Sequence, residues 1–275
     1  MPTILRLRLI PQQNCTLRLD NAPAHGWFHA LAAETDAAWQ QQLHKANGMR
    51  EVALSPFCGG ASCIPLDEEE AVPLSPLRVG RLSAGQPLSL RVAFTEDERA
   101  RRFCQSLPAV PIPRLGAAPC LLARLPRFHT GDPDLLHASW AHLADAPPAR
   151  RLHLRFETPT FFSHQGEMRL LPEPARLWED WRRAWEALAP ALPLGAEALT
   201  LDGLQITRYQ LHTEAVPLKG GLWRGFVGEM ALEWRANVPP ETRRTAAALA
   251  GIADFTGTGA KTMLGLGQTR LTVEE

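Results

Sequence analysis

The residues with the clearest chemical potential lie near the C-terminal end, in the segment FTGTGAKTMLGLGQTRL, residues 255–271. Four glycines surround a Lys-Thr pair in this segment: Gly257, Gly259, Gly265 and Gly267 around Lys261 and Thr262. Glycine lets another backbone approach closely and leaves amide groups free to point at phosphates. The segment therefore predicts contact with phosphate, carried either by a nucleotide or by a nucleic acid backbone.

A nucleotide is the less favoured source of phosphate, because the glycines fit neither of the common nucleotide loops. A P-loop has the pattern G-x-x-x-x-G-K-[ST], and here Phe255 and Ala260 stand where its two glycines belong. P-loops and dinucleotide loops also follow a strand and open a helix, whereas this segment follows an expected helix and opens an expected strand. We therefore predict no ATP, GTP or NAD cofactor.

A purely structural role for the glycines is the alternative. Gly257 or Gly259 could end the preceding helix in the left-handed conformation, and Gly265 and Gly267 could relieve crowding where the strand begins. This alternative explains single glycines easily, but it accounts less well for four of them at such close spacing.

Histidines and cysteines are the other residues with chemical potential. The chain has nine histidines, and because histidine titrates near neutral pH, two of them brought together could act as general base and general acid. The five cysteines are scattered and odd in number, which argues against a disulfide framework. Cys58 and Cys63 are close, but no second pair or nearby histidine completes a zinc site, so we predict no metal.

The composition and the N-terminal segment favour a cytoplasmic protein. Of the 275 residues 45% are hydrophobic, and 29 basic residues balance 29 acidic ones. This zero net charge argues mildly against a nucleic acid partner, although nearly all the positive charge is arginine, which suits phosphate contacts. Residues 1–12 alternate apolar and charged side chains as a strand does, unlike a signal peptide, and no stretch is long and apolar enough to span a membrane.

Hydrophobic periodicity indicates the elements that must position these residues. In the first half, strands are expected at 3–11, 50–57, 85–94 and 118–128, and helices at 25–48 and 95–107. In the second half, strands are expected at 150–162, 204–213, 222–234 and 264–275, and helices at 173–188 and 239–255. The turn-forming residues of 129–149 suggest a linker between the halves, and residues 65–76 a loop.

Both halves follow the order strand, helix, strand, strand, helix, strand, which is the ferredoxin-like or RRM-like plan. We therefore predict an α+β fold with two tandem ferredoxin-like β-α-β-β-α-β domains, at residues 1–145 and 146–275. The duplication rests on element order alone, because the halves share no strong residue-level repeat.

The spacing of the glycines resembles the signature of a known family. The four glycines form the pattern G-x-G-x-x-x-x-x-G-x-G before the last strand, with Lys261 inside it. This pattern resembles the RAMP superfamily of CRISPR-associated proteins, and the member it is most similar to is the repeat-specific endoribonuclease that cuts precursor CRISPR RNA. The segments LHKANG, VALSPF, ETPTFF and LPEP add to the resemblance.

The resemblance implies metal-independent cleavage of precursor CRISPR RNA within its repeats, with no cofactor. The 2'-hydroxyl upstream of the scissile phosphate attacks in line, and the products carry a 2',3'-cyclic phosphate and a 5'-hydroxyl. The implied partners are CRISPR repeat RNA and, in an effector complex, other CRISPR-associated subunits. The protein itself would be a monomer or a homodimer.

The resemblance also implies which residues carry the chemistry. His44, near the end of the first helical region, matches the key histidine of the family, and His29 matches a second group earlier in that region. Lys45 would stabilise the charge on the pentavalent phosphate. His25, one turn from His29 on a helix, is a rival for the second role, and the base and acid roles of His29 and His44 stay open.

RNA binding is expected from the second half of the chain. In the glycine-rich segment, Gly257, Gly259, Gly265 and Gly267 would let RNA phosphates approach, and Lys261 and Thr262 would contact them. Arg155 is the leading candidate among the arginines, and its neighbours in the candidate set are Arg150, Arg151, Arg208 and Arg224.

The histidine pair places a geometric demand on the first helical region. The 15 residue steps from His29 to His44 would span about 22 Å of unbroken helix, too far for one phosphate to meet both. The segment ETDAAW offers a break, because Thr35 or Asp36 can cap a new helix there. We therefore predict two short helices, 24–34 and 36–45.

Two other functions remain as alternatives. The protein could be a non-catalytic RAMP-type subunit that holds a guide RNA in an effector complex. It could also be an unrelated tandem ferredoxin-like enzyme or small-molecule sensor, in which case the glycine pattern would be accidental.

Overall fold

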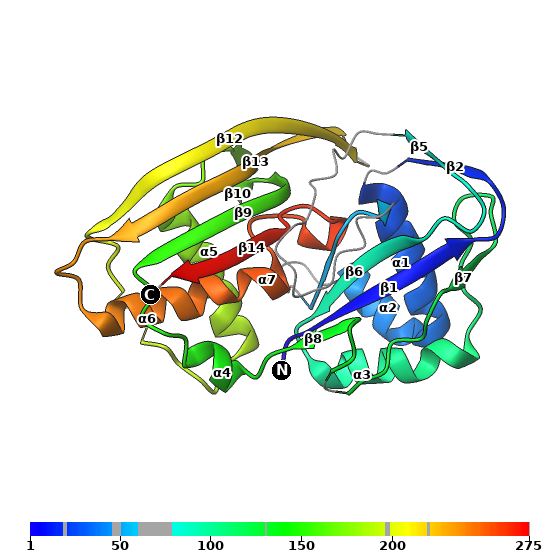
Figure 1. Cartoon of the computed structure of the whole chain (residues 1–275), viewed down its shortest axis with the longest axis horizontal. Helices are drawn as coiled ribbons and strands as arrows, with labels where there is room; N and C mark the ends of the chain where they lie inside the picture. The colour runs from blue at the N-terminus through cyan, green and yellow to red at the C-terminus, as the bar shows by residue number, and fades with distance from the viewer. Residues whose placement is uncertain are drawn as a thin grey trace. The chain divides into compact units, whose positions relative to one another are not determined.

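The computed structural model describes residues 1–18, 21–45, 51–59, 79–129, 131–195, 199–218 and 221–274 (Figure 1). The chain divides into two units. The first comprises Met1–His137 with Val216–Gly221 and Met263–Gly265, and the second comprises Ala138–Ala215, Leu222–Thr262 and Leu266–Glu275. The domain boundary predicted between residues 145 and 146 stays a prediction.

The first unit is built on an antiparallel sheet in the order β3-β6-β1-β7. Its strands are β1 (Thr3–Pro11), β3 (Val52–Leu54), β6 (Leu88–Phe94) and β7 (Cys120–Leu122), with β4 (Cys58–Gly59) beside β6 and β8 (Leu135–His137) beside β1. Because side chains alternate along a strand, Leu5, Leu7 and Leu9 of β1 share one face, where they are fully buried. Strands β2 (Cys15–Arg18) and β5 (Val79–Leu82) form a separate two-stranded sheet.

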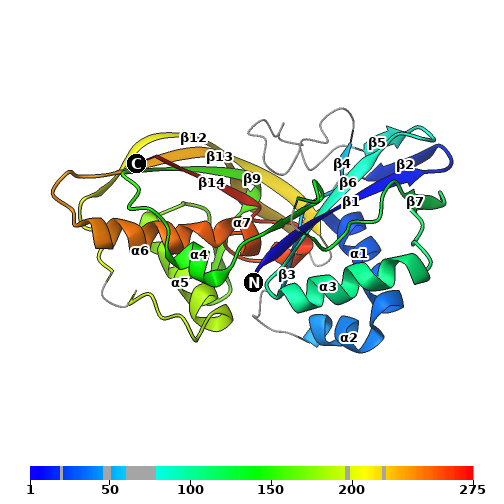
Figure 2. The same ribbon diagram turned by 60° about the horizontal axis from the view of Figure 1, so that its bottom comes forward.

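The helices of the first unit cover the leucine face of this sheet. They are α1 (Asn21–Thr35), α2 (Ala37–Lys45) and α3 (Asp97–Ser106), followed by the short η1 (Leu107–Ala109), and Figure 2 shows them on one side of β1 and β6. Phe28, Trp39 and Phe103, one from each helix, join the leucines in a single buried core. Burial of large side chains at this interface stabilises the fold by roughly 1.5–3 kcal/mol for each one.

A capped break separates α1 from α2. Asp36 lies between the helices, and its Oδ1 accepts a hydrogen bond from the backbone N–H of Trp39 at 2.9 Å. This is the side-chain cap that begins a new helix by satisfying one of its free N–H groups. The break predicted at Thr35–Asp36 is confirmed.

The second unit has an antiparallel sheet in the order β12-β13-β9-β14. Its strands are β9 (Arg151–Thr160), β12 (Leu204–Leu218), β13 (Gly221–Trp234) and β14 (Thr269–Glu274), and a small hairpin joins β10 (Phe162–His164) to β11 (Glu167–Arg169). Leu152, Leu154 and Phe156 alternate onto the buried face of β9. The glycine-rich segment leads directly into β14 at the edge of this sheet.

The helices of the second unit are α4 (Trp140–Ala144), α5 (Pro174–Leu188), α6 (Pro240–Gly251) and α7 (Ala253–Thr256), and η3 (Thr262–Leu264) is a short 3-10 turn. Figure 1 shows α5 and α6 against the same face of the sheet. Trp178, Trp181 and Trp185 recur at helical spacing along α5 and are all buried. They form the core with the inner residues of β9 and β13.

The observed architecture confirms the predicted α+β class and the β-α-β-β-α-β order. In each main sheet the first and third strands lie side by side in the centre, β1 with β6 and β9 with β13, as the ferredoxin-like plan requires. The expected linker at 129–149 is more structured than predicted, because it contains β8 and α4. The predicted loop at 65–76 lies outside the described residues.

Within the described part of the chain, no helix has the length and apolar character needed to cross a membrane.

Candidate functional site

His29 lies in the core of the first unit, against α2. It is 6% exposed, and its Nδ1 lies 3.4 Å from Nε2 of Gln40 on α2. The ring of His25 lies 4.3 Å away, centroid to centroid, and is only half-buried. The two predicted histidines of α1 therefore form one contiguous pair whose accessible member is His25.

His44 and Lys45 end α2, one turn beyond Gln40. Their side chains lie outside the described residues, so the predicted convergence of His44 with His29 stays a prediction. The backbone supplies one relevant fact. Residues four apart lie on the same face of a helix, so position 44 shares a face of α2 with Gln40, which contacts His29.

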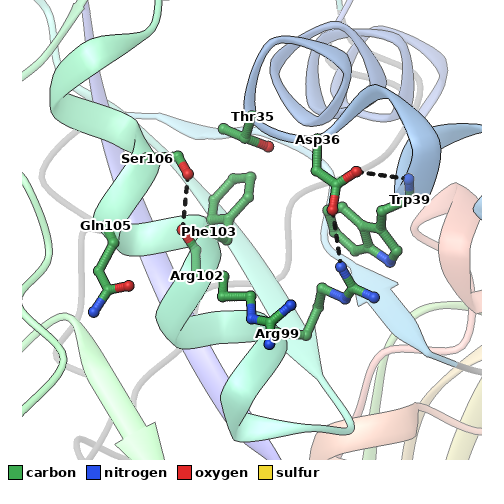
Figure 3. A pocket seen from close by; sticks show the side chains of 8 residues that line it. All are labelled: Thr35, Asp36, Trp39, Arg99, Arg102, Phe103, Gln105 and Ser106. Atoms are coloured by element: carbon green, nitrogen blue, oxygen red, sulfur yellow. Dashed lines mark hydrogen bonds and ion pairs between the residues drawn. The ribbon is translucent and has the colours of Figure 1, made fainter.

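A cavity of about 270 Å³ opens at the break between α1 and α2 (Figure 3). Its lining residues are Thr35, Asp36, Trp39, Arg99, Arg102, Phe103, Gln105 and Ser106. Both arginines are neutralised by neighbours: Arg99 pairs with Asp36 at 3.1 Å, and Arg102 pairs with Glu98 at 2.8 Å. Arg99 also lies over the Trp39 ring, 5.1 Å from its centroid, so these contacts tie the break to α3.

Gly257, Gly259 and Gly267 of the glycine-rich segment pack closely against neighbouring backbone of the second unit. Gly257 follows the last residue of α7, has a φ of 69° and donates its N–H to the carbonyl of Ala253, which makes it the helix C-cap. A Cβ at Gly259 would overlap the carbonyl oxygen of Phe161. Similarly, a Cβ at Gly267 would overlap the carbonyl oxygen of Thr258. These glycines are therefore required by close approach of the chain to itself.

The amide groups of the segment are directed inward. Gly259 N–H donates to Asp180 Oδ2 at 2.8 Å, and Gly267 N–H donates to the carbonyl of Pro159 at 3.1 Å. Thr262 is 4% exposed and packs its methyl group near Gly257 and Gly267. Gly265, with a φ of 81°, also has a backbone that favours glycine. The structure thus supports the purely structural alternative for the glycines and Thr262, and contact of these residues with RNA stays a prediction.

Lys261 is the part of the segment that faces outward. It is exposed, its φ is 62°, and its Nζ lies 4.3 Å above the centroid of the Trp223 ring. Trp223 in turn stacks on Phe161 at 5.5 Å. Because Ala260 N–H also donates to the Phe161 carbonyl, Phe161 fixes both the backbone of the loop and the ring beneath the ammonium group.

Arg155 lies on the outer face of the second sheet, half-buried between Glu229 on β13 and Arg270 on β14. The same face carries Arg151, which pairs with Glu233 at 3.1 Å and with Glu274 at 3.0 Å. The hydrogen bond from Arg151 lowers the pKa of the Glu233 carboxyl. This face is therefore a network of opposite charges and not a uniformly basic stripe.

The comparisons with known proteins connect this geometry to a family. Residues 154–269 match the family model of the CRISPR-associated endoribonuclease Cas6. This range includes Arg155, Lys261 and all four glycines of the segment. No curated protein sequence matches the chain.

Solved structures match the whole chain. The Thermus thermophilus Cas6 covers 99% of this chain and 98% of its own, with 26% identity and a TM-score of 0.70. A product complex of the same Cas6 covers 99% of this chain and 100% of its own, with 27% identity and a TM-score of 0.74. A product complex of another Cas6 is similar in fold, with 23% identity, coverage of 98% and 99%, and a TM-score of 0.68. The resemblance predicted from the glycine pattern is therefore confirmed, because residues 154–269 match the Cas6 family model and the whole chain is similar to the Thermus thermophilus Cas6.

Proposed function

We propose that this protein is a metal-independent endoribonuclease that cleaves precursor CRISPR RNA within its repeats. The observation that carries the proposal is the capped break at Asp36, because it turns α2 so that Gln40 meets His29. A continuous helix would have kept the histidines of α1 away from the end of α2. The relation to the Thermus thermophilus Cas6, one structure of which is a product complex, supports RNA as the substrate.

The proposed chemistry needs three groups. A base removes the proton of the 2'-hydroxyl, an acid protonates the leaving 5'-oxygen, and a positive charge stabilises the phosphorane. We assign one proton transfer to His44 and the other to the pair formed by His29 and His25. Lys45, next to His44 in α2, supplies the positive charge. The products are a 2',3'-cyclic phosphate and a 5'-hydroxyl.

RNA binding is assigned to the second unit through Lys261 and Arg155. The packed glycines hold the backbone of residues 257–267 in place, and the Trp223 ring holds the Lys261 ammonium group at the surface. A fixed cation loses little conformational freedom when a phosphate binds. We place the protein in the cytoplasm, with repeat RNA as its partner and CRISPR effector subunits as further partners.

Incubation with CRISPR repeat RNA in EDTA tests the proposal. We expect cutting at one site in the repeat, with 2',3'-cyclic phosphate and 5'-hydroxyl ends. The variant His44→Ala should lower the cleavage rate by about 10²–10⁴-fold and still bind the RNA. His142→Ala, which removes an exposed histidine of α4, is the matched control. A strict Mg²⁺ requirement, or full activity of His44→Ala, would contradict the mechanism.

The burial of His29 favours one alternative, a non-catalytic subunit that holds CRISPR RNA. At 6% exposure this ring is placed as a core histidine is, and a relative that had lost cleavage could retain it for packing. Tight binding of repeat RNA without any cutting, by the wild-type protein, would identify this second function.

A further inference from the structure

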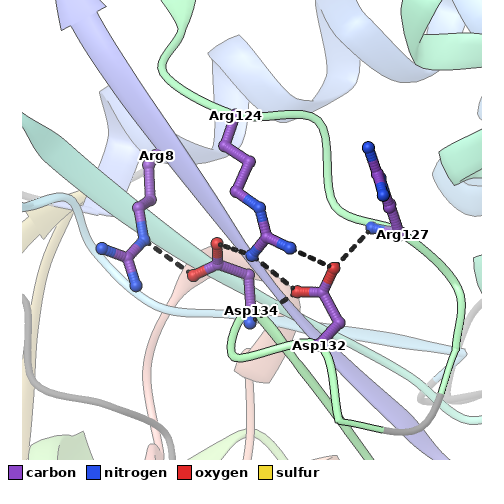
Figure 4. Close-up of polar contacts among 5 residues, drawn as sticks. All are labelled: Arg8, Arg124, Arg127, Asp132 and Asp134. Atoms are coloured by element: carbon purple, nitrogen blue, oxygen red, sulfur yellow. Dashed lines mark hydrogen bonds and ion pairs between the residues drawn. The ribbon is translucent and has the colours of Figure 1, made fainter.

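Two buried aspartates lie beneath Arg8 of β1 and Arg124 in the first unit (Figure 4). Asp134 accepts a hydrogen bond from Arg8 Nε at 2.7 Å and one from Arg124 at 3.2 Å. Asp132 accepts from both terminal nitrogens of Arg124, at 3.0 and 2.8 Å. The aspartate side chains are 0% and 3% exposed, for Asp132 and Asp134, whereas Arg8 is 32% exposed. The carboxylates therefore fix two guanidinium groups at the surface.

Asp132 is ionised in this arrangement. Burial raises the pKa of its carboxyl, but hydrogen bonds from the backbone N–H groups of Asp134 and Arg127 and the charge of Arg124 outweigh burial, and the pKa lies below its ordinary value. A permanent negative charge keeps Arg124 in place. The bidentate pair of Arg124 and Asp132 closes the segment 124–132 on itself. Backbone hydrogen bonds, from Ala123 to the carbonyl of Arg8 and from Arg6 to the carbonyl of Asp134, attach the flanking chain to β1, so the structural role of the cluster is explained without the Arg8 side chain.

One side of the Arg8 guanidinium group faces away from Asp134. It uses Nε for Asp134, and Figure 4 shows its terminal nitrogens beyond that contact. Within the described part of the chain, Asp134 is the ion-pair partner of Arg8. Two N–H groups of a guanidinium match two oxygens of a phosphate, and a carboxylate behind Nε pre-orients them.

Two guanidinium groups of this cluster reach the surface. Arg8 is 32% exposed and Arg124 is 40% exposed, whereas the carboxylates that hold them are buried. Exposed positive charge concentrated at one place attracts a polyanion even when the net charge of the protein is zero.

This site lies on the face of the sheet opposite the histidines. Leu5 and Leu7 face the core that contains α1 and α2, and Arg8 alternates to the other side of β1. A phosphate bound at Arg8 is therefore separated by the sheet from the helices that carry His25, His29 and position 44. It must be a different phosphate from the one that is cleaved.

We propose that Arg8, positioned by Asp134, binds one phosphate of the RNA backbone outside the cleavage site. This inference rests on the proposed function and adds a second contact point for the same RNA. Because the contact is remote from the histidines, it contributes equally to binding of substrate and transition state, and its loss should affect affinity and not the rate at saturation.

The test compares Arg8→Ala, Asp134→Asn and a control, Arg127→Ala. Arg127 meets Asp132 through its backbone N–H, and Figure 4 shows its side chain directed away from the carboxylates, so the control removes an exposed arginine beside the site. Binding is measured with repeat RNA in which hydrogen replaces the attacking 2'-hydroxyl.

We expect Arg8→Ala to weaken binding about five- to tenfold and to reduce the salt slope by about 0.7–0.9. Asp134→Asn should weaken binding less, and single-turnover cleavage by Arg8→Ala at saturating protein should match the wild type within about twofold.

Methylphosphonate substitution, one phosphate of the RNA at a time, locates the contact. One position should weaken wild-type binding but cause no further loss with Arg8→Ala. Equal affinities and salt slopes for Arg8→Ala and Arg127→Ala would overturn the inference while leaving the proposed function intact, and so would loss of cleavage at saturation by a correctly folded Arg8→Ala. If the wild type neither binds nor cuts repeat RNA, the proposed function fails and this inference fails with it.

Discussion

His29 combines a titratable ring with almost complete burial, and its neighbour His25 does not. A general acid or base must lie within hydrogen-bond reach of its proton on the substrate, directly or through one water. His25 is half-buried and in ring contact with His29, so it is the more accessible member of the pair and the one we propose to act on the substrate. We infer that the buried ring of His29 packs against His25 and holds that ring in position.

Alanine substitutions separate these two roles. His25→Ala should lower the single-turnover rate by about 10²-fold with little change in the free energy of unfolding. His29→Ala opens a cavity against Phe28, so it should lower that free energy by about 1–3 kcal/mol and reduce the rate as well. Thermal melts and single-turnover assays measure both effects. If His25→Ala cleaved at the wild-type rate, the proton transfer would be assigned to His29 instead.

Lys261 has a backbone conformation that is unfavourable for a residue with a Cβ atom. Its φ of 62° costs a residue with a Cβ roughly 1 kcal/mol that glycine does not incur. Lys261→Gly should therefore be about 1 kcal/mol more stable than Lys261→Ala, although both lose the contact with Trp223. Both variants should weaken RNA binding equally, because both lose the ammonium group. Urea unfolding and salt-dependent binding of the two variants check this, and tighter RNA binding by Lys261→Gly would contradict it.

Residue types alone were enough to suggest phosphate and histidine chemistry, but not to assign contacts. The segment around Lys261 indicated phosphate, yet the groups that accept its amides are Asp180 and the carbonyl of Pro159, far away in the chain. Arg8 and Asp134 were not singled out by any motif. Their only sequence signal is the pair of arginines that alternate with leucines in β1, which becomes meaningful once β8 pairs with that strand.

At the scale of elements, the break at Asp36 sets the direction of α2. Asp36→Ala loses both the cap on Trp39 N–H and the ion pair with Arg99, and should lower the free energy of unfolding by about 1–2 kcal/mol. Asp36→Asn keeps a good capping oxygen and loses only a partly exposed ion pair, worth about 0–1 kcal/mol. Chemical denaturation should therefore rank the wild type and Asp36→Asn above Asp36→Ala. Equal losses for the two variants would mean that the ion pair, not the cap, holds the break.

The glycine-rich segment makes a second element-scale prediction. Gly259 and Gly166 both have positive φ, 78° and 82°, but only Gly259 lies against backbone, since nothing lies within 4 Å of a Cβ at Gly166. Gly166→Ala should cost about 1 kcal/mol from its backbone alone. Gly259→Ala should cost about 1–3 kcal/mol more, because Phe161 must move, and should weaken RNA binding by displacing Lys261. Similar melting temperatures for the two variants would show that the close packing is not required.

The elements themselves were predictable to different degrees. The cap at Asp36 acts locally, so ETDAAW was sufficient to predict the break. Strand β8 was missed inside the expected linker, because Leu135 to His137 form a strand only through pairing with β1. Short segments whose partner is distant in sequence have no local periodicity to reveal them.

At the scale of the whole molecule, the order of elements predicted the fold, whereas the net charge carries little information about a nucleic acid partner. Two β-α-β-β-α-β halves follow directly from the alternation of strands and helices, and both cores are built as that order requires. A net charge of zero counted against nucleic acid, but net charge averages over the surface. Buried Asp132 and Asp134 contribute to that zero although their side chains do not face solvent.

Stability against acid is a property of the whole molecule in which Asp132 should be prominent. Its pKa in the folded protein lies below the ordinary value of 3.8, so over the window between the two pKa values the unfolded chain binds more protons than the folded one. The stabilisation is therefore fully present above the ordinary pKa and is lost as the pH falls through the folded one. Asp132→Asn should be less stable than the wild type at pH 7 and should show a shallower fall in melting temperature between about pH 5 and 2. Asp202→Asn, which changes an exposed carboxylate, should leave the fall unchanged. If the melting temperatures of the wild type and Asp132→Asn fell in parallel with pH, the charge of Asp132 would add nothing to stability through its contact with Arg124.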